Sequence, residues 1–182
     1  MEFTELIVKR RSCRKYADKP VDHAVILEAL KQAQMAPSWR NHQCARCYVV
    51  EAGDFLDGFR QRALPGGNPK NAENAVLIIT TYVRGKEGFW ENEAGQFEPA
   101  NELGDKWGAY DLGLHDAYLI LALENAGLSS LIMGLRHSDV IRRELEIPEE
   151  EDIVSVIAVG HRDAEPVLGP RKPLEETVRF IK

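Results

Sequence analysis

The stretch Arg10-Arg11-Ser12-Cys13-Arg14-Lys15-Tyr16 places four cations and one hydroxyl within seven residues, directly after an apolar-patterned N-terminal segment. We expect a first helix over residues 5–14, capped by Thr4. In such a helix Arg10 and Arg14 share a face. Two guanidiniums beside a serine hydroxyl suit a phosphomonoester, whose three oxygens accept charge-assisted hydrogen bonds. The alternative is a solvated basic turn at a helix C-terminus, where cations also favour the helix dipole.

Length and composition indicate a globular chain. Its 182 residues are 44% hydrophobic and 29% charged, so we expect a single domain spanning residues 1–182. The sequence has no apolar run long enough for a membrane span and no basic, apolar leader. Three cysteines without such a leader indicate a reducing compartment, and we expect a cytoplasmic protein without a membrane partner.

The charge is unevenly distributed along the chain. The formal net charge is −6, yet residues 1–46 hold nine Lys or Arg against five Asp or Glu. An acidic protein with a basic N-terminal patch is a poor nucleic-acid binder, because phosphates would meet repulsion over the rest of its surface. We therefore expect no nucleic-acid partner and a small anion bound at the basic stretch.

Several common site patterns are missing. Cys44 and Cys47 form a C-x-x-C at the start of an expected strand, where their side chains would point to opposite faces, so we expect no disulfide between them. No second Cys/His pair completes a zinc site, and we expect no metal. Neither G-x-G-x-x-G nor G-x-x-x-x-G-K-[ST] occurs. The scattered histidines (His42, His115, His137 and His161) are interpreted as structural or surface residues.

Hydrophobic periodicity predicts a mixture of helices and strands. Residues 76–83 form an almost unbroken, β-branched apolar run, typical of a central strand covered on both faces. Residues 103–126 carry an apolar repeat at spacings of three and four and end at Gly127, which predicts a long helix. Residues 84–102 show no period and are expected to form an excursion or lid. Further strands are expected at 47–50, 131–134 and 154–160, and shorter helices near 22–35, 54–64 and 139–145.

Taken in order, these pieces resemble the FMN-dependent nitroreductase family over nearly the whole chain. The resemblance rests on the basic stretch, the loop Ala36-Pro37-Ser38-Trp39-Arg40-Asn41-His42-Gln43, the segment Gly127-Leu128-Ser129-Ser130-Leu131-Ile132-Met133-Gly134, the strand 156–161 and the tail Pro170-Arg171-Lys172-Pro173-Leu174-Glu175-Glu176. It implies an α+β fold: a three-layer α-β-α sandwich with a mostly antiparallel central sheet and a long central helix, assembled as an intertwined homodimer.

The resemblance also implies site residues. Arg10 and Ser12 would hold the FMN phosphate with Arg171 or Lys172, Arg11 would also bind the cofactor, and Arg14 would reach the N1/O2 side of the isoalloxazine. Residues from the partner subunit (Pro37, Ser38 and Asn41) would complete the site. The backbone of Leu131, Ile132, Met133 and Gly134 would run along the ring, with the Met133 amide near N5; Asn68, Lys70 or Asn71 would add a polar contact. No side chain is expected to be catalytic, because the chemistry occurs at FMN N5.

An aromatic set is expected to form the substrate pocket: Trp39, Phe89 and Trp90. The alternative for Trp39 is packing at the dimer interface. Two positions depart from the family pattern, since Cys44-Ala45 stands where Pro and an aromatic residue usually follow the loop, and Ser129 replaces a glycine. Both changes bear on the space near the ring and hence on the acceptor.

The implied activity is that of an FMN-dependent oxidoreductase. NADH or NADPH would reduce the flavin, leave, and be replaced by a small acceptor such as a nitroaromatic or a quinone, in a ping-pong mechanism. Both nicotinamide donors stay open, because no dinucleotide-binding motif indicates a preference. The alternatives are a specialised member of the superfamily, such as a reductive dehalogenase, and a flavin-binding dimer without NAD(P)H turnover.

Overall fold

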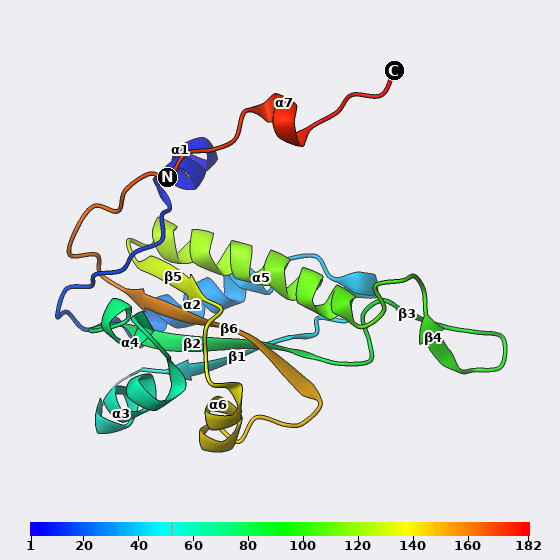
Figure 1. Ribbon diagram of the computed structural model, residues 1–182, viewed down its shortest axis with the longest axis horizontal. Coiled ribbons are helices and arrows are strands. Elements are labelled where there is room, and N and C mark those ends of the chain that lie inside the picture. Colours follow the sequence, from blue (N-terminus) through cyan, green and yellow to red (C-terminus); the bar gives the residue numbers. More distant parts are fainter. Residues whose placement is uncertain (52) are drawn as a thin grey trace.

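The computed structural model describes residues 1–51 and 53–182 (Figure 1). Helices and strands alternate along the chain, with a 3-10 turn η1 before the first strand. In order they are α1 (Phe3–Lys9), α2 (His23–Ala33), η1 (Trp39–Asn41), β1 (Ala45–Val50), α3 (Gly53–Ala63), α4 (Asn68–Asn71), β2 (Val76–Val83), β3 (Phe89–Glu91), β4 (Phe97–Pro99), α5 (Lys106–Asn125), β5 (Ser129–Met133), α6 (Ser138–Glu144), β6 (Glu151–Gly160) and α7 (Leu174–Thr177).

The main sheet has the order β1-β2-β6-β5, and each neighbouring pair is antiparallel. Tyr48 pairs with Ile79 between β1 and β2, and Leu131 pairs with Ala158 between β5 and β6. The two inner strands carry the long apolar runs, and β2 is buried along nearly its whole length. The prediction of a central strand at 76–83 is therefore confirmed.

Helices cover both faces of this sheet, which confirms the three-layer α-β-α sandwich (Figure 1). On one face, α2 and α5 pack against Ile78 and Ile157 through side chains such as Ile26 and Leu119. The opposite face is covered by α3, α4 and α6, whose buried residues include Phe59. Each fully buried side chain of this size stabilises the fold by about 1.5–3 kcal/mol relative to exposure. The long central helix was predicted within a few residues of its observed bounds.

The first helix differs from the prediction. It ends at Lys9, and the basic stretch after it is extended, because Ser12 forms a parallel bridge with Ser130 and pairing with a strand is incompatible with helix. Its N-cap is Glu2, without a side-chain capping bond, and not Thr4. The expectation that Arg10 and Arg14 share one helix face is therefore wrong.

Two segments project from the body. The excursion expected at 84–102 contains the hairpin β3–β4, which extends from one end of the molecule in Figure 1. The C-terminal tail carries α7 away from the sheet, and its apolar side chains Val167, Phe180 and Ile181 are exposed. Across residues 1–51 and 53–182, no helix has the length and hydropathy required to cross a membrane.

Gly108 in the first turn of α5 allows a close approach between helix and sheet. A Cβ there would lie 2.3 Å from Cδ2 of Tyr82, a buried ring whose hydroxyl donates to Asp152. We predict that Gly108→Ala lowers the free energy of unfolding by about 1–3 kcal/mol through overpacking. In the same helix, Gly113 has open space around its Cα. Gly113→Ala should raise the free energy of unfolding by up to about 1 kcal/mol, owing to helix propensity. Urea unfolding of both variants checks the pair, and equal effects would contradict it.

Candidate functional site

The basic stretch lies against the edge strand β5. The Cys13 amide donates to the Ser130 carbonyl at 3.0 Å, and Ala17 N donates to His161 O at 2.8 Å. Between them, the hydroxyl of Tyr16 lies 3.1 Å from the carbonyl of Cys13 and 3.2 Å from that of Ala158, and can donate to either. Burial raises the pKa of Tyr16, so this hydroxyl remains a donor at every physiological pH. The stretch is fixed to the sheet through its backbone, which leaves its cations free to face outward.

These cations differ in how they are paired. Lys15 forms an ion pair with Asp163 at 2.6 Å, and Arg11 donates to the Arg10 carbonyl. Among the described residues, no carboxylate oxygen lies within 4.0 Å of the Arg10 or Arg14 guanidinium. Ser12 between them is exposed. Two unneutralised guanidiniums and a free hydroxyl are a donor set that an anion can occupy.

The start of β5 lies beside this donor set, where Ser130 pairs with Ser12, and the chain continues through residues 131–134. Leu131 and Met133 are buried on the core side, whereas Ile132 is 46% exposed. After Gly134 the chain is tied to α4, because Asn68 Nδ2 donates to the Leu135 carbonyl at 3.1 Å. The helix α4 also carries Lys70 and Asn71. The basic stretch is thus joined to the start of β5, and the segment with the three candidate polar contacts is joined to the residue after Gly134.

The serine that replaces the expected glycine at position 129 has a structural partner. The buried Ser129 hydroxyl accepts from Arg162 Nε at 2.8 Å, and the same guanidinium pairs with buried Glu124 near the end of α5. This connection ties the long helix to the start of β5. The Ser129 side chain therefore connects the start of β5 to the end of α5 through Arg162, on the buried side of the strand. It adds no group to the exposed face of β5.

The loop before β1 forms a second group of predicted residues. Trp39 N donates to Asp111 Oδ2 at 2.6 Å, and Trp39 Nε1 donates to the Phe89 carbonyl at 3.1 Å. The indole also packs edge-on against Trp107, with ring centroids 5.2 Å apart. Trp39 and Phe89 are therefore neighbours as expected, whereas Trp90 is exposed on the hairpin.

The loop backbone has an unusual conformation. Arg40, Asn41 and Gln43 have positive φ values of 49°, 58° and 55°. Left-handed conformations are costly for residues with a Cβ, so tertiary contacts must hold them. Here Gln43 N donates to Ser38 Oγ at 2.9 Å, in addition to the bonds of Trp39.

The loop and the basic stretch lie at opposite edges of the sheet. The loop leads into β1, the basic stretch lies along β5, and β2 and β6 separate these two edge strands. One chain therefore does not bring Pro37, Ser38 and Asn41 to the arginines. The tail residues Arg171 and Lys172 are also apart, in an exposed segment where Arg171 donates to carbonyls of its own neighbours, Gly169 and Pro170.

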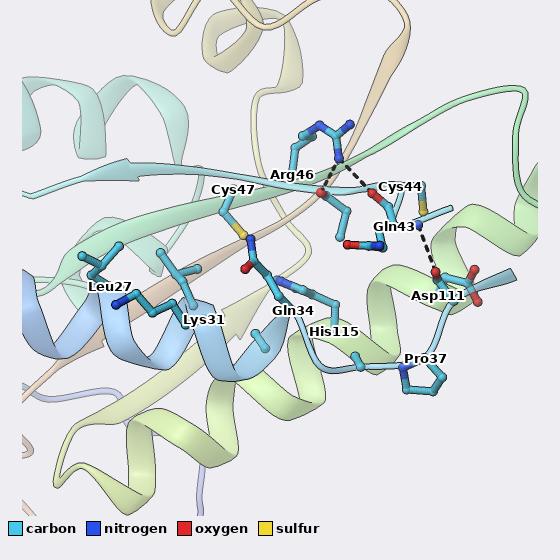
Figure 2. A pocket seen from close by; sticks show the side chains of 15 residues that line it. Leu27, Lys31, Gln34, Pro37, Gln43, Cys44, Arg46, Cys47, Asp111 and His115 are labelled. Carbon is cyan, nitrogen blue, oxygen red and sulfur yellow. Dashed lines mark hydrogen bonds between the residues drawn. The ribbon is translucent and has the colours of Figure 1, made fainter. Parts of the chain in front are cut away.

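A pocket of about 390 Å³ opens beside the loop, between α2, β1 and α5 (Figure 2). Of the predicted site residues it is lined by Pro37 and Ser38. Its other lining residues come from the three elements and from the segment that joins α2 to β1: Leu27, Leu30, Lys31, Ala33, Gln34, Ala36, Gln43, Cys44, Ala45, Arg46, Cys47, Asp111 and His115. The pocket thus belongs to the loop side and contains none of the predicted phosphate ligands.

Residues 7–161 match the model of the Nitroreductase family. The chain belongs to this family. The matched range includes the basic stretch, the loop and β5, and it ends before Arg171 and Lys172. The expectation that Arg171 or Lys172 binds FMN is therefore supported by the motif resemblance in the tail and not by the family match.

Relatives of known name or structure agree with this membership. An NADH dehydrogenase from Thermus thermophilus is 27% identical, with 94% of this chain and 92% of the relative covered. A solved oxidoreductase containing FMN superposes with a TM-score of 0.81 at 24% identity, covering 100% of this chain and 94% of the other. An FMN- and NADPH-dependent nitroreductase from Sphigopyxis sp. strain HMH has a TM-score of 0.79 at 18% identity, with both chains fully covered. At these identities the structures show the shared nitroreductase fold.

Sequence patterns did not single out the residues that anchor the loop. The apolar repeat predicts Trp107 and Asp111 as residues of the long helix, and Glu87 lies in a stretch without period. The spacing of four between Trp107 and Asp111 places both on one face of α5, toward Trp39. In the sequence, this spacing was the one indication that Trp107 and Asp111 contact the loop together. No regular spacing in the sequence indicates that Glu87 lies near either of them.

Proposed function

We propose that this protein is an FMN-dependent oxidoreductase that takes electrons from NADH or NADPH and passes them to a small acceptor, such as a nitroaromatic or a quinone, in a ping-pong cycle. The observation that carries the proposal is the pair of unneutralised arginines, Arg10 and Arg14, held on either side of Ser12 along β5. The names of the relatives, which include an NADH dehydrogenase and an FMN- and NADPH-dependent nitroreductase, support the same chemistry.

The residues fit a flavin mononucleotide. Arg10, Arg11 and Ser12 would bind its phosphate, and each charge-assisted hydrogen bond contributes about 1.5–3 kcal/mol. Bound FMN supplies the redox chemistry, accepting a hydride from the nicotinamide and returning electrons to the acceptor. Arg14 would stabilise negative charge on the N1/O2 side of the ring, and the backbone of residues 131–134 would orient the ring along β5. Trp39 and Phe89 would form a wall for a flat acceptor, with an aromatic contribution of about 0.5–1.5 kcal/mol.

We further propose a homodimer in which each site uses residues of two chains. The support is the placement of Pro37, Ser38 and Asn41 at the sheet edge opposite Arg10 and Ser12. Exposed apolar side chains on α1 and in the tail are consistent with an interface: Phe3, Ile7, Val8, Phe180 and Ile181. A two-fold arrangement would give two identical sites.

The visible absorption spectrum of the purified protein tests the proposed activity. We expect a yellow protein, or one that becomes yellow with added FMN, that bleaches anaerobically with NADH or NADPH. Re-oxidation by a nitroaromatic or quinone should then restore the colour. A yellow protein that neither donor bleaches would limit the function to flavin binding, and a protein that takes up no FMN would overturn the proposal.

The phosphate ligands are tested by Arg10→Ala. Loss of a charge-assisted hydrogen bond should weaken FMN binding by about 10- to 100-fold. Fluorescence titration of the flavin-free protein measures this affinity. Lys19→Ala is the matched control, since it removes an exposed cation nearby but outside the basic stretch, and it should bind FMN like the wild type. An Arg10→Ala protein with wild-type affinity would contradict the assignment.

The shared site is tested by re-pairing two defective variants, Arg10→Ala and Asn41→Asp. Random re-pairing of equal amounts makes half of the dimers mixed. If residue 10 of one chain and residue 41 of its partner meet at one site, one of the two sites in each mixed dimer carries neither substitution. About one quarter of all sites should then regain wild-type affinity for limiting FMN. The same mixture without unfolding and refolding is the control. Recovery of no sites after demonstrated re-pairing would show that both residues act within one chain.

A further inference from the structure

A buried cluster of metal-ligand side chains lies at the loop end of the pocket, next to the loop residues proposed for the shared flavin site and away from the basic stretch. Ligand atoms of Cys44, Glu87 and Asp111 all lie within 4.8 Å of one another, and all three residues are buried. They come from three different segments: Cys44 directly precedes β1, Glu87 follows β2, and Asp111 lies on α5. Figure 2 shows the Cys44 sulfur close to the Asp111 carboxylate.

The burial of the Glu87 carboxylate is the feature of this cluster that indicates a bound ligand. The Glu87 side chain is 0% exposed, and neither of its carboxylate oxygens has a hydrogen-bond partner among the described residues. Burying an ionised carboxylate without such partners is strongly unfavourable. A buried polar group left in this state indicates a ligand or ion that binds it. The basic group beside it is His42, whose Nδ1 lies 3.7 Å from Glu87 Oε2.

Asp111 is already oriented toward the cluster. Its Oδ2 accepts the hydrogen bond from Trp39 N, which leaves Oδ1 available to a cation. A backbone donor of this kind is typical of the outer shell that fixes a metal-binding carboxylate. Cys44 Sγ lies 3.8 Å from the Gly108 carbonyl, a weak contact that a metal bond would replace.

We propose that Cys44, Glu87 and Asp111 bind a divalent transition-metal ion, zinc by the chemistry of the donors, with His42 as the fourth ligand. One sulfur, one imidazole nitrogen and two carboxylates form a donor set that suits zinc, whereas Mg²⁺ and Ca²⁺ prefer oxygen alone. Tetrahedral bonds of about 2.0–2.3 Å separate neighbouring donor atoms by about 3.3–3.8 Å. The donor atoms of Cys44, Glu87 and Asp111, within 4.8 Å of one another, approach this geometry through small side-chain rotations. His42, which contacts Glu87 alone of the three, would turn its ring toward the ion to complete the set.

The ion would resolve the charge problem of the cluster. Cys44, Glu87 and Asp111 are acidic groups that lie close together and away from solvent, where a cation would offset the cost of their negative charge. Zn²⁺ would bind them as thiolate and carboxylates, because the metal stabilises these forms. Four protein ligands would close the coordination sphere, which is the pattern of a structural site. Such an ion would join the loop, the segment after β2 and α5, and His42, whose side chain is 30% exposed, would lie at its entrance.

Metal titration of the full-length protein tests this site. After removal of metals with a chelator, the protein should take up about one Zn²⁺ per chain, measured by mass spectrometry of the metal content, and its melting temperature should rise with added Zn²⁺. Co²⁺ in place of Zn²⁺ should give the charge-transfer absorption of a cobalt–thiolate bond. Neither readout depends on activity, and the cobalt spectrum is recorded on flavin-free protein, because flavin absorbs in the same region.

Variants distinguish the cluster from other thiols. Cys44→Ser should abolish the cobalt–thiolate band, and Glu87→Gln should weaken Zn²⁺ binding at least tenfold. Glu87→Gln replaces the carboxyl group by an amide of the same shape, so its metal-free form should fold as the metal-free wild type does. Cys47→Ala is the matched control, because Cys47 lies on β1 outside the cluster; it should retain both the band and the stoichiometry.

Three outcomes would overturn the site. The first is a wild-type protein that takes up no stoichiometric metal, in which case the buried carboxyls are simply protonated. The second is Zn²⁺ affinity unchanged in Glu87→Gln. The third is a cobalt–thiolate band that survives in Cys44→Ser and disappears in Cys47→Ala.

Discussion

The backbone hydrogen bond from Cys13 to Ser130 is the contact on which the arrangement of the proposed site depends. It adds an extended segment to the outer edge of β5 and thereby ends the first helix before the arginines. Tyr16 reinforces it from the core, where its buried hydroxyl reaches carbonyls of both the segment and β6. With the backbone used for pairing, Arg10, Ser12 and Arg14 are left to face an anion. A rigid sheet therefore positions a set of flexible cations.

The order of the strands then decides what one chain can and cannot do. Because β2 and β6 lie between the two edge strands, the loop before β1 and the basic stretch along β5 form separate surfaces. The loop surface has its own pocket, aromatic packing and buried acids. The basic surface has the unpaired arginines and the edge of β5. This separation is the physical reason for proposing that two chains meet at each flavin.

Much of the architecture could be predicted from the sequence. The apolar run at 76–83 indicated the buried central strand, and the repeat ending at Gly127 indicated α5 within a few residues. The basic stretch was misassigned because local periodicity carries no information about pairing with Ser130, more than a hundred residues later. The cluster of Cys44, Glu87 and Asp111 could not be predicted from the sequence for the same reason. Its members are isolated single residues, and only the fold brings them within reach of one another.

The left-handed backbone at Arg40, Asn41 and Gln43 has a consequence for how the loop can fail. Conformational energy is stored there, and the contacts made by Trp39 and Ser38 offset it. One of these contacts comes from α5, where Asp111 accepts from the Trp39 amide, and another joins Trp39 to the Phe89 carbonyl. If these contacts are lost, all three residues can relax together toward ordinary right-handed or extended conformations. The loop should therefore form or unfold as one cooperative unit, and the hydrogen bond from Trp39 to Asp111 on α5 should help to hold it in the folded state.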